Sequence, residues 1–453
     1  MNKRSKTIIA SIVVCLPLLW AMTPAADSPN DSKSTTQLTR LDTTTTAMTT
    51  HNWSNDSDQQ RLETVLSRMN QRLEQDMSDY EAQLIKGIVY FQHGQRQQAI
   101  DELTRLAQRA PTFHLAHLIR ADMISSPFVN VSDIGQPGLL VDNRKQEIVS
   151  ALRHEAMMRL QASLSPVDTT KVPVQLLNMG RNTQTALIVD KSRHRLYVYQ
   201  RKGDDQPPEF IRDFYISTGR ATGNKSNEGD LRTPEGVYFI TSFIPDEKLP
   251  EKYGIGAFPT NYPNAFDQRL GKTGDGIWLH GTDRIYYSRP PLDSEGCVVL
   301  SNSDLHKIQH LIKPGVTPVV IADRIDWVDH QQWQQVRQEV LGSLDQWRQD
   351  WESMDVSKYL SHYSRSFWSG RHDYSSWQTY KSRVIRQKSF QKIGISDISL
   401  FYYPKQASSG KDLVVARFIQ DYRSNNFNSE TGKQLYFGKE QDHWRIVYEG
   451  RAL

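Results

Sequence analysis

The sequence predicts a multidomain protein of mixed α and β structure: a helical segment, then a mostly β domain, then a smaller α+β domain. The chain has 453 residues, of which 38% are apolar and 23% charged, so it is long enough to bury more than one hydrophobic core. Its apolar residues follow a helical period up to about residue 165 and alternate with polar residues from about residue 185. Beyond a further helix, alternating segments return near the C-terminus and predict a second sheet.

The N-terminus has the pattern of a secretory signal peptide. Basic residues precede an apolar run over residues 7–22, and small residues follow this run before Asp27. We therefore expect residues 1–26 to direct export into the periplasm, with an uncleaved inner-membrane anchor as the alternative. The next segment, residues 27–60, consists mostly of Ser, Thr, Asp, Asn and Gln, which predicts a disordered linker.

The helical segment over residues 61–165 contains one unit with the pattern of a tetratricopeptide-type repeat. The small, aromatic, small, apolar and proline positions of that repeat are occupied by Gly87, Tyr90, Ala99, Leu103 and Pro111. A helix pair cannot bury its apolar face alone, so this TPR-like segment must pack on its neighbours or on a partner. Two interpretations remain open: a helical spacer and a docking module for another protein.

The middle of the chain, residues 185–323, has the pattern of a mostly β domain with long loops. Alternation in residues 186–189 and 195–199, separated by polar turn residues, predicts a β-hairpin. Further β-rich segments cover residues 210–217, 236–243 and 317–321.

The C-terminal part, residues 330–453, predicts helices followed by a curved antiparallel sheet, which together make a cone-shaped α+β domain. A helix is expected over residues 333–351. Strands are expected over residues 395–403, 413–422, 432–439 and 443–448. Aromatic residues gather before these strands, where a plain hydrophobic core is favoured over a ligand pocket.

Cysteine usage singles out one residue. Of the two cysteines, Cys15 lies in the predicted signal peptide, so Cys297 is the single thiol of the mature chain. A thiol needs a nearby base or cation to become a nucleophile at neutral pH, and His280 is the nearest candidate in the sequence. Gly296 allows a close approach of the backbone, so that amides near Gly296 and Cys297 face a developing oxyanion. On this local pattern alone, a histidine on a buried strand is more often a core residue than a base, and the glycine before the cysteine can simply serve a turn.

A family resemblance extends this pattern. The stretch from His280 through Ser294-Glu295-Gly296-Cys297 resembles the catalytic signature of the L,D-transpeptidase (YkuD-type) family. Other landmarks of the family are matched in order by residues 217–219, 229–236 and 271–281, so that the resemblance covers roughly residues 185–323. The string of residues 297–302 and the α+β tail look like the cell-shape-determining branch, in which an NTF2-like domain follows the catalytic domain.

The resemblance implies roles for the signature residues. Cys297 would be the nucleophile, His280 its general base, and the carbonyl of Gly281 would orient the imidazole. Gly296 and Ser294 would shape the turn and the oxyanion hole. Peptidoglycan stem peptides would be the substrate, attacked at the carbonyl between an L-centre and a D-residue. An amine acceptor would make the enzyme a transpeptidase, and water would make it an L,D-carboxypeptidase.

Two positions depart from the common signature of the family. Glu295 stands where a second histidine is usual, and Val299 stands where many members have Asn or Arg. The first change removes an imidazole, and the second alters how a substrate carboxylate is held. Both changes weaken the expectation of ordinary cross-linking activity.

Substrate-binding candidates lie on either side of the signature. Arg232 and Arg284 carry guanidinium groups that bind carboxylates in a bidentate manner, although solvated surface charges are the more common role. Trp278 and Tyr286 are expected to wall the cleft or to pack in the core.

Several other function classes are disfavoured. The formal net charge is +4, and Lys3, Arg4 and Lys6 in the predicted signal peptide supply three of these charges, which argues against nucleic-acid binding. A thiol oxidoreductase would need a resolving cysteine, and no Cys/His cluster has metal-ligand spacing, so neither a metal nor a cofactor is expected. The remaining rival is a non-catalytic wall-binding scaffold. Besides stem peptides, a protein partner of the TPR-like helices and a homodimer are the candidate interactions.

Overall fold

The computed structural model describes residues 56–127, 143–405, 407–408 and 410–452. The predicted signal peptide and all but the end of the predicted linker lie outside these residues. The end of that linker, residues 56–60, is helical instead, because these polar residues form the first turn of a helix whose buried side chains begin at Leu62. Within the described ranges, no helix has both the length and the apolar character needed to span a membrane.

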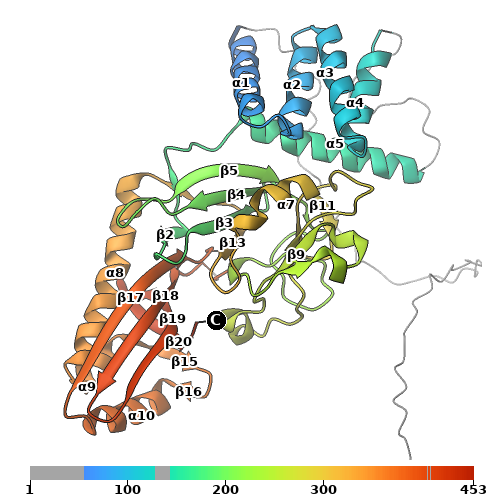
Figure 1. Cartoon of the computed structure of the whole chain (residues 1–453). Coiled ribbons are helices and arrows are strands. Elements are labelled where there is room, and N and C mark those ends of the chain that lie inside the picture. The colour runs from blue at the N-terminus through green and yellow to red at the C-terminus, as the bar shows by residue number, and fades with distance from the viewer. Residues whose placement is uncertain (1–55, 128–142, 406, 409, 453) are drawn as a thin grey trace, which may run out of the picture. The chain divides into compact units, whose positions relative to one another are not determined.

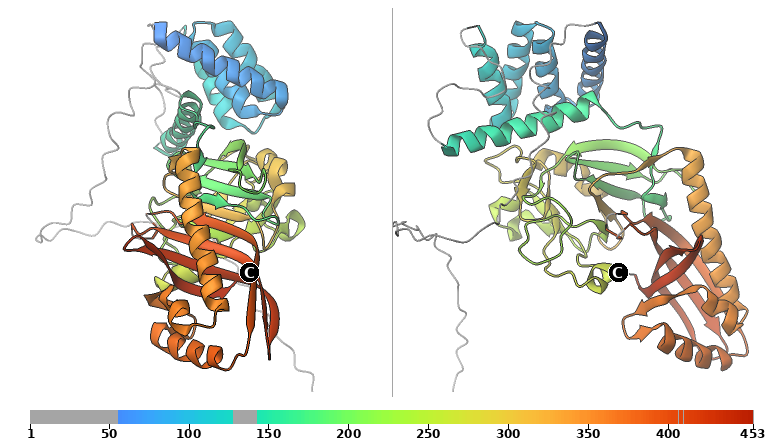
Figure 2. Two further views of the ribbon diagram at one scale, coloured as in Figure 1. Left: turned by 90° about the vertical axis from the view of Figure 1, so that its left-hand side faces the viewer. Right: turned by 180° about the vertical axis from the view of Figure 1, so that it is seen from behind.

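The helical segment contains five helices within the described residues. They are α1 (Asp56–Gln75), α2 (Tyr80–Gln92), α3 (Arg96–Arg109), α4 (His114–Ser125) and α5 (Asn143–Leu164). Helices α1 to α4 stand side by side, and α5 runs across their ends (Figures 1 and 2). Their apolar faces meet in one buried cluster, as the helical periodicity predicts.

The α2–α3 pair shows why the sequence needs a small residue at position 87. A Cβ atom added to Gly87 would lie 2.8 Å from Cγ of Leu103, which is itself fully buried. The absence of a side chain therefore lets the two helices approach closely. The likeness of this pair to a tetratricopeptide-type repeat stays a prediction.

The middle domain is built on a five-stranded sheet with the order β5-β4-β3-β13-β7. Its strands are β3 (Thr185–Asp190), β4 (Arg195–Gln200), β5 (Glu209–Tyr215), β7 (Gly236–Phe239) and β13 (Pro318–Ala322). Strands β3 and β4 form the predicted antiparallel hairpin, and β13 lies parallel to β3. Strand β7 ends at Phe239 instead of continuing to residue 243, because Phe243 lies in an exposed loop.

Shorter elements form a second layer. A four-stranded sheet has the order β12-β10-β9-β8, with β8 (Ile244–Pro245), β9 (Gly256–Pro259), β10 (Trp278–His280) and β12 (Val298–Val299). Further elements of the domain are β6 (Thr218–Gly219), which pairs with β11 (Leu292–Ser294), and the helices α6 (Ala265–Arg269) and α7 (Asn302–Ile308). A short 3₁₀ helix, Glu251–Tyr253, leads into β9.

The five-stranded sheet is buried on both faces. One face, with Leu187 and Val198, packs with Leu279 and Val298 of the second layer. The opposite face packs with residues of the C-terminal domain such as Phe401. Burial on both faces explains why β3 is apolar almost throughout, whereas a sheet with one exposed face would alternate more strictly.

The C-terminal domain consists of helices packed on a seven-stranded sheet with the order β16-β15-β20-β19-β18-β17-β2. The helices are α8 (His330–Glu352), α9 (Val356–Ser361) and α10 (Tyr374–Arg386). The strands are β15 (Tyr363–Ser369), β16 (His372–Asp373), β17 (Gln391–Tyr402), β18 (Leu413–Ser424), β19 (Asn428–Glu440) and β20 (His443–Arg451). Helix α8 lies along one face of this curved sheet (Figure 1).

The strand β2 (Leu176–Asn178), which precedes the middle domain, joins this C-terminal sheet beside β17. Close by, β1 (Val172–Pro173) pairs with β14 (Trp327–Val328). The segment before the middle domain and the segment after it are therefore bound together.

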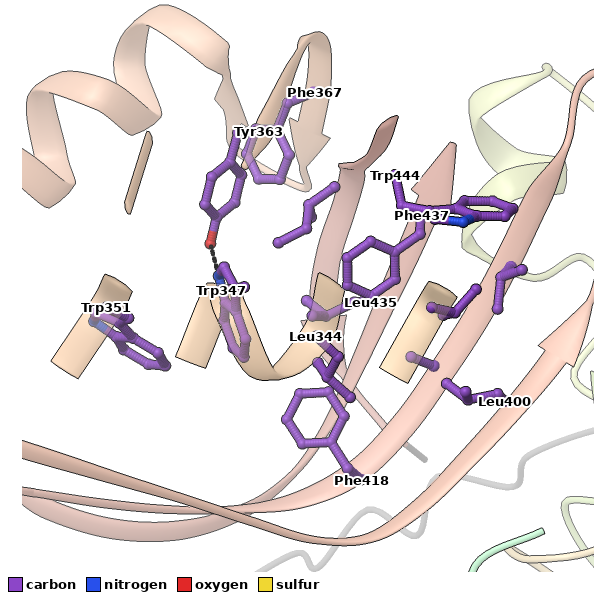
Figure 3. Packing of buried hydrophobic residues seen from close by; sticks show 14 of the residues in the cluster. Leu344, Trp347, Trp351, Tyr363, Phe367, Leu400, Phe418, Leu435, Phe437 and Trp444 are labelled. Atoms are coloured by element: carbon purple, nitrogen blue, oxygen red, sulfur yellow. Dashed lines mark hydrogen bonds between the residues drawn. The ribbon is translucent and has the colours of Figure 1, made fainter. Parts of the chain in front are cut away.

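Aromatic side chains fill the core of the C-terminal domain. Figure 3 shows Trp347 and Trp351 of α8 facing Tyr363 and Phe367 across the cluster. The Trp347 indole donates a hydrogen bond to the Tyr363 hydroxyl at 3.1 Å, so its buried polar atom is satisfied. These aromatics form a hydrophobic core, as favoured from the sequence. The predicted fold class, a helical segment followed by a mostly β domain and an α+β domain, is confirmed.

Candidate active site

Two neighbouring parallel strands carry the predicted nucleophile and base. His280 is the last residue of β10, and Cys297 directly precedes β12. The register pairs Leu279 with Val298 and His280 with Val299. Because side chains alternate along a strand, Cys297 and His280 point to the same face of this sheet, two positions apart along the strands.

The imidazole of His280 is deeply buried, with 3% of its surface exposed. Its Nδ1 atom lies 2.5 Å from the carbonyl oxygen of Gly281, as the family resemblance implied. This contact places the proton on Nδ1 and leaves Nε2 as the basic atom. The ring of Tyr253 packs edge-on against the imidazole at a centroid distance of 4.9 Å.

Burial is the main influence on the imidazole pKa. It lowers the pKa of His280 to about 4, and the nearby positive charges of Arg289 and Lys252 act in the same direction. The hydrogen bond to the Gly281 carbonyl opposes this shift because it favours the protonated ring. At neutral pH the imidazole is therefore uncharged and able to accept a proton.

The thiol of Cys297 donates a hydrogen bond to the carbonyl of Gly276 at 3.4 Å. Burial raises its pKa, and the negative charge of Glu295 raises it further. A hydrogen bond from the Trp278 backbone and the charge of Lys252 act against this rise. The resting site therefore holds a neutral thiol and a neutral imidazole, not a thiolate–imidazolium pair.

The turn before the nucleophile is held by Ser294. Its hydroxyl accepts a hydrogen bond from the Gly296 amide at 3.1 Å and donates one to the Cys297 carbonyl at 2.7 Å. This differs from the expectation that the Gly296 amide faces an oxyanion, because the hydroxyl already accepts its hydrogen bond. The Cys297 amide is left as the candidate oxyanion donor.

Position 296 requires glycine for two reasons. Its φ angle is +130°, a backbone conformation that other residues rarely adopt. A Cβ atom there would also lie 2.8 Å from the carbonyl oxygen of Arg232. The landmark around Arg232 thus forms the wall against which the nucleophile turn packs.

The other sequence landmarks meet at the same place. The backbone of Ser217 exchanges two hydrogen bonds of 2.9 Å with Val299, next to the nucleophile. The Gly219 amide donates to the Thr233 hydroxyl at 2.8 Å, which ties the first landmark to the second. The third landmark supplies Gly276, whose carbonyl accepts the thiol hydrogen bond.

The predicted substrate-binding residues have different surroundings. Trp278 is half-buried, and its ring lies 5.0 Å from that of Tyr253. Arg232 is exposed, whereas the guanidinium of Arg284 is engaged by Asp246. Tyr286 is exposed, and its ring lies 5.5 Å from that of His114, the first residue of α4.

Sequence reasoning missed several residues that shape the site. Lys252 and Tyr253, which belong to the short 3₁₀ helix before β9, influence the imidazole from outside the signature. Asn302 accepts hydrogen bonds from the amides of Thr282 at 3.1 Å and Ile255 at 3.3 Å. Its position directly after the Cys-Val-Val-Leu-Ser string was the one available signal. Among the described residues, no group of three His, Cys, Asp or Glu side chains is placed to hold a metal ion.

Comparisons with known proteins agree with this geometry. Residues 184–321 match the model of the L,D-transpeptidase catalytic domain, YkuD. Residues 339–450 match the Cds6 C-terminal NTF2-like domain. No curated protein matches the chain.

Two solved structures are similar over most of their own length. The structure of Bd1075 from Bdellovibrio bacteriovorus is 31% identical, with 62% of this chain and 98% of that chain covered and a TM-score of 0.55. The helical cell shape determining protein Pgp2 from Campylobacter jejuni is 26% identical, with 61% and 95% covered and a TM-score of 0.52. The chain therefore belongs to the L,D-transpeptidase (YkuD-type) family, in which its catalytic domain is followed by an NTF2-like domain.

Proposed function

We propose that this protein is an exported peptidoglycan-modifying enzyme that transfers acyl groups at the L,D bonds of stem peptides. The observation that carries the proposal is the placement of Cys297 on the same sheet face as a buried, uncharged His280 whose Nδ1 is fixed by the Gly281 carbonyl. That arrangement leaves Nε2 as a base on the same sheet face as the thiol. Membership of the L,D-transpeptidase family supplies the reaction class.

In the first step, the thiol of Cys297 attacks the carbonyl carbon between the L-centre and the terminal D-residue. Its proton passes to Nε2 of His280 as the carbon–sulfur bond forms. The carbonyl oxygen becomes an oxyanion, which the Cys297 amide is placed to stabilise. The Gly281 carbonyl stabilises the imidazolium, since its oxygen lies 2.5 Å from Nδ1 and accepts the Nδ1 proton's hydrogen bond.

In the second step, the carbon–nitrogen bond breaks and the imidazolium protonates the leaving amine of the D-residue. A thioester on Cys297 remains. An acceptor then attacks this thioester while His280 takes the acceptor's proton, and the thiol is regenerated. Transfer to an amine makes a cross-link, whereas transfer to water trims a tetrapeptide to a tripeptide.

The second candidate outcome is L,D-carboxypeptidase activity, because Glu295 weakens the expectation of ordinary cross-linking. This side chain is exposed beside the nucleophile, where the common signature has a histidine. A carboxylate there replaces a possible second imidazole. The similarity to Pgp2, which is described as a helical cell shape determining protein, supports a role in cell shape for either activity.

The test is to incubate the purified mature protein with disaccharide tetrapeptide and its dimers, and to analyse the products by mass spectrometry beside a Cys297→Ala control. New 3,3-linked dimers would identify a transpeptidase. Tripeptide alone would identify an L,D-carboxypeptidase. If neither product depends on Cys297, the enzymatic proposal fails and a non-catalytic wall-binding scaffold takes its place.

Location and partners follow from the same proposal. The signal-peptide pattern of residues 1–26 supports export to the periplasm, where stem peptides are found. Cell fractionation with an antibody against the mature chain tests this. Recovery of the protein in the cytoplasm would contradict it.

A further inference from the structure

The chain between the two proposed catalytic residues, the His–Cys segment of residues 281–296, leaves its own domain to contact the helices. Tyr287 is 9% exposed and belongs to the buried cluster of the helical segment. Its ring lies 4.3 Å from that of Phe113 and 5.6 Å from that of Tyr80. Its amide donates a hydrogen bond to the carbonyl of Thr112, between α3 and α4, at 3.0 Å.

A polar contact lies beside this apolar one. The hydroxyl of Ser288 donates a hydrogen bond to Oε1 of Glu155 in α5 at 2.6 Å. Glu155 is buried and forms an ion pair with Arg159, one helical turn later, at 2.8 Å. The helix thus presents a fixed carboxylate to the His–Cys segment.

Arg159 links the helix to the segment by a second route. Its guanidinium lies 3.8 Å from the ring centre of Tyr215, at the end of β5. The Tyr215 hydroxyl in turn donates to the carbonyl of Arg289 at 3.0 Å. The side chain of Arg289 is held by Asp293, within the same segment, at 2.7 Å.

The helical segment is itself fixed to the catalytic domain. Arg159 also pairs with Glu81 of α2 at 2.8 Å, and Glu81 pairs with Arg195 of β4 at the same distance. The helices that contact the His–Cys segment are therefore anchored to the five-stranded sheet, on which the layer that carries His280 and Cys297 packs.

We propose that the helical segment is a positioning element of the active site, in which Tyr287 and the Ser288–Glu155 pair hold the His–Cys segment in register. The proposal rests on the proposed function, because it assigns the helices a part in that reaction. A long connection with little secondary structure has many conformations, and each contact to a rigid neighbour removes some of them. His280 and Cys297 flank this connection, so its anchoring limits their relative displacement, to which reaction rates are steeply sensitive.

The assignment also bears on the two interpretations of the helices. A spacer would need no contact with the His–Cys segment. A docking module would keep its binding face free for a partner. Here, part of the buried helical core is completed by Tyr287, so this face is already occupied by the chain's own active-site region.

The experiment compares Ser288→Ala, Ser288→Thr and Glu155→Gln in the full mature chain. Ile285→Ala is the matched control, since Ile285 lies in the same segment and is 60% exposed. We expect Ser288→Ala and Glu155→Gln to lower kcat by about tenfold with less than about a twofold change in KM. Ser288→Thr keeps the hydroxyl and should restore most of kcat, and Ile285→Ala should match the wild type.

A second readout does not depend on the substrate. The rate of alkylation of Cys297 by iodoacetamide, followed by intact mass, is measured across pH for each variant and for His280→Gln. Loss of positioning should move the pH profile of Ser288→Ala towards that of His280→Gln. If the wild type alkylates but makes no peptidoglycan product, the proposed function fails while the positioning is still tested.

Two sets of results would overturn the inference. If Ser288→Ala and Glu155→Gln keep the wild-type kcat and alkylation profile while only the melting temperature falls, the helices merely stabilise the fold. An unchanged profile, unchanged kcat and unchanged melting temperature would likewise overturn it.

Discussion

Nη1 of Arg195 lies 2.8 Å from Oε1 of Glu81, and Nη2 lies 3.0 Å from Oε2, so that one bidentate pair joins helix α2 to strand β4. Glu81 is 7% exposed and faces Arg159 and Arg72 as well. Burial alone would raise the pKa of this carboxyl, but the charges of Arg195 and Arg159 hold it well below its ordinary range. The carboxylate is thus ionised in the folded protein throughout the neutral range.

Removing the Glu81 charge should destabilise the protein strongly. Glu81→Gln leaves Arg159 and Arg195 buried with one negative partner fewer, and breaking a buried pair in this way typically costs about 3–5 kcal/mol. Urea unfolding followed by circular dichroism measures the loss. Glu63→Gln, an exposed change on α1, serves as the control and should be near neutral. Equal midpoints for the two variants would contradict the expectation.

The activity of the enzyme should persist well below the ordinary pKa of histidine. Because burial lowers the pKa of His280 to about 4, the acid limb of kcat/KM should have its midpoint near that value. The raised pKa of Cys297 keeps the thiol protonated at neutral pH, so the profile should stay flat into the mildly alkaline range. Initial rates on tetrapeptide between about pH 3 and about pH 9 test this. A midpoint near 6.5 would show that the imidazole is exposed to water.

Lys252 should make the Cys297 thiol more reactive than it would be through burial alone. This exposed ammonium lowers the pKa of both His280 and Cys297. Lys252→Met should therefore raise the thiol pKa and slow alkylation at pH 8 by about twofold, an effect that added salt should diminish in the wild type. Lys248→Met removes a nearby exposed charge and serves as the control. Identical rates for Lys252→Met and the wild type would refute the assignment.

Gly296→Ala should abolish most of the activity without unfolding the helices. The new methyl group would meet the Arg232 carbonyl at 2.8 Å in a backbone conformation that alanine avoids. Displacement of the nucleophile by about 1 Å commonly costs about a hundredfold in rate. Gly223→Ala is the matched control, because Gly223 also has positive φ but nothing lies within 4 Å of the added atom. Loss of activity in both variants would point to backbone strain alone.

Local pattern predicted those features that depend on nearby residues. Alternation identified the β3–β4 hairpin because its strands are joined by a short turn, and the family signature singled out Cys297 and His280, which the structure places on neighbouring strands. Strand β2 escaped prediction, because its partner β17 lies more than two hundred residues later. Pairings of that kind depend on how the domains pack, and the hydrophobic pattern of a short segment carries no information about a distant partner.

The same limit applies to charged residues. Glu81 reads as a solvent-facing residue of an amphipathic helix, yet it is buried because its neighbours in space are Arg159 and Arg195. Lys252 was missed because it lies outside the signature, on a short 3₁₀ helix that the fold brings near His280. The cysteine count and the family resemblance therefore identified the residues proposed to react, whereas the groups that set their pKa values needed the fold.

His194 should make the stability of the protein depend on pH between 5 and 7.5. It is buried, and burial together with the charge of His154 lowers its pKa to about 4. The unfolded chain takes up a proton near pH 6.5, whereas the folded chain does so only near 4. The full free energy of unfolding is thus present above pH 6.5, and the part of it linked to His194 is lost as the pH falls towards 4.

The variant that isolates this effect is His194→Asn, since asparagine tolerates the positive φ of 51° at this position. Between pH 7.5 and pH 5, the wild type should lose about 2 kcal/mol more stability than the variant. Urea unfolding at the two pH values gives both differences, and comparing the differences cancels any fixed cost of the substitution. Equal losses would mean that His194 takes up its proton as readily in the folded protein as in the unfolded chain.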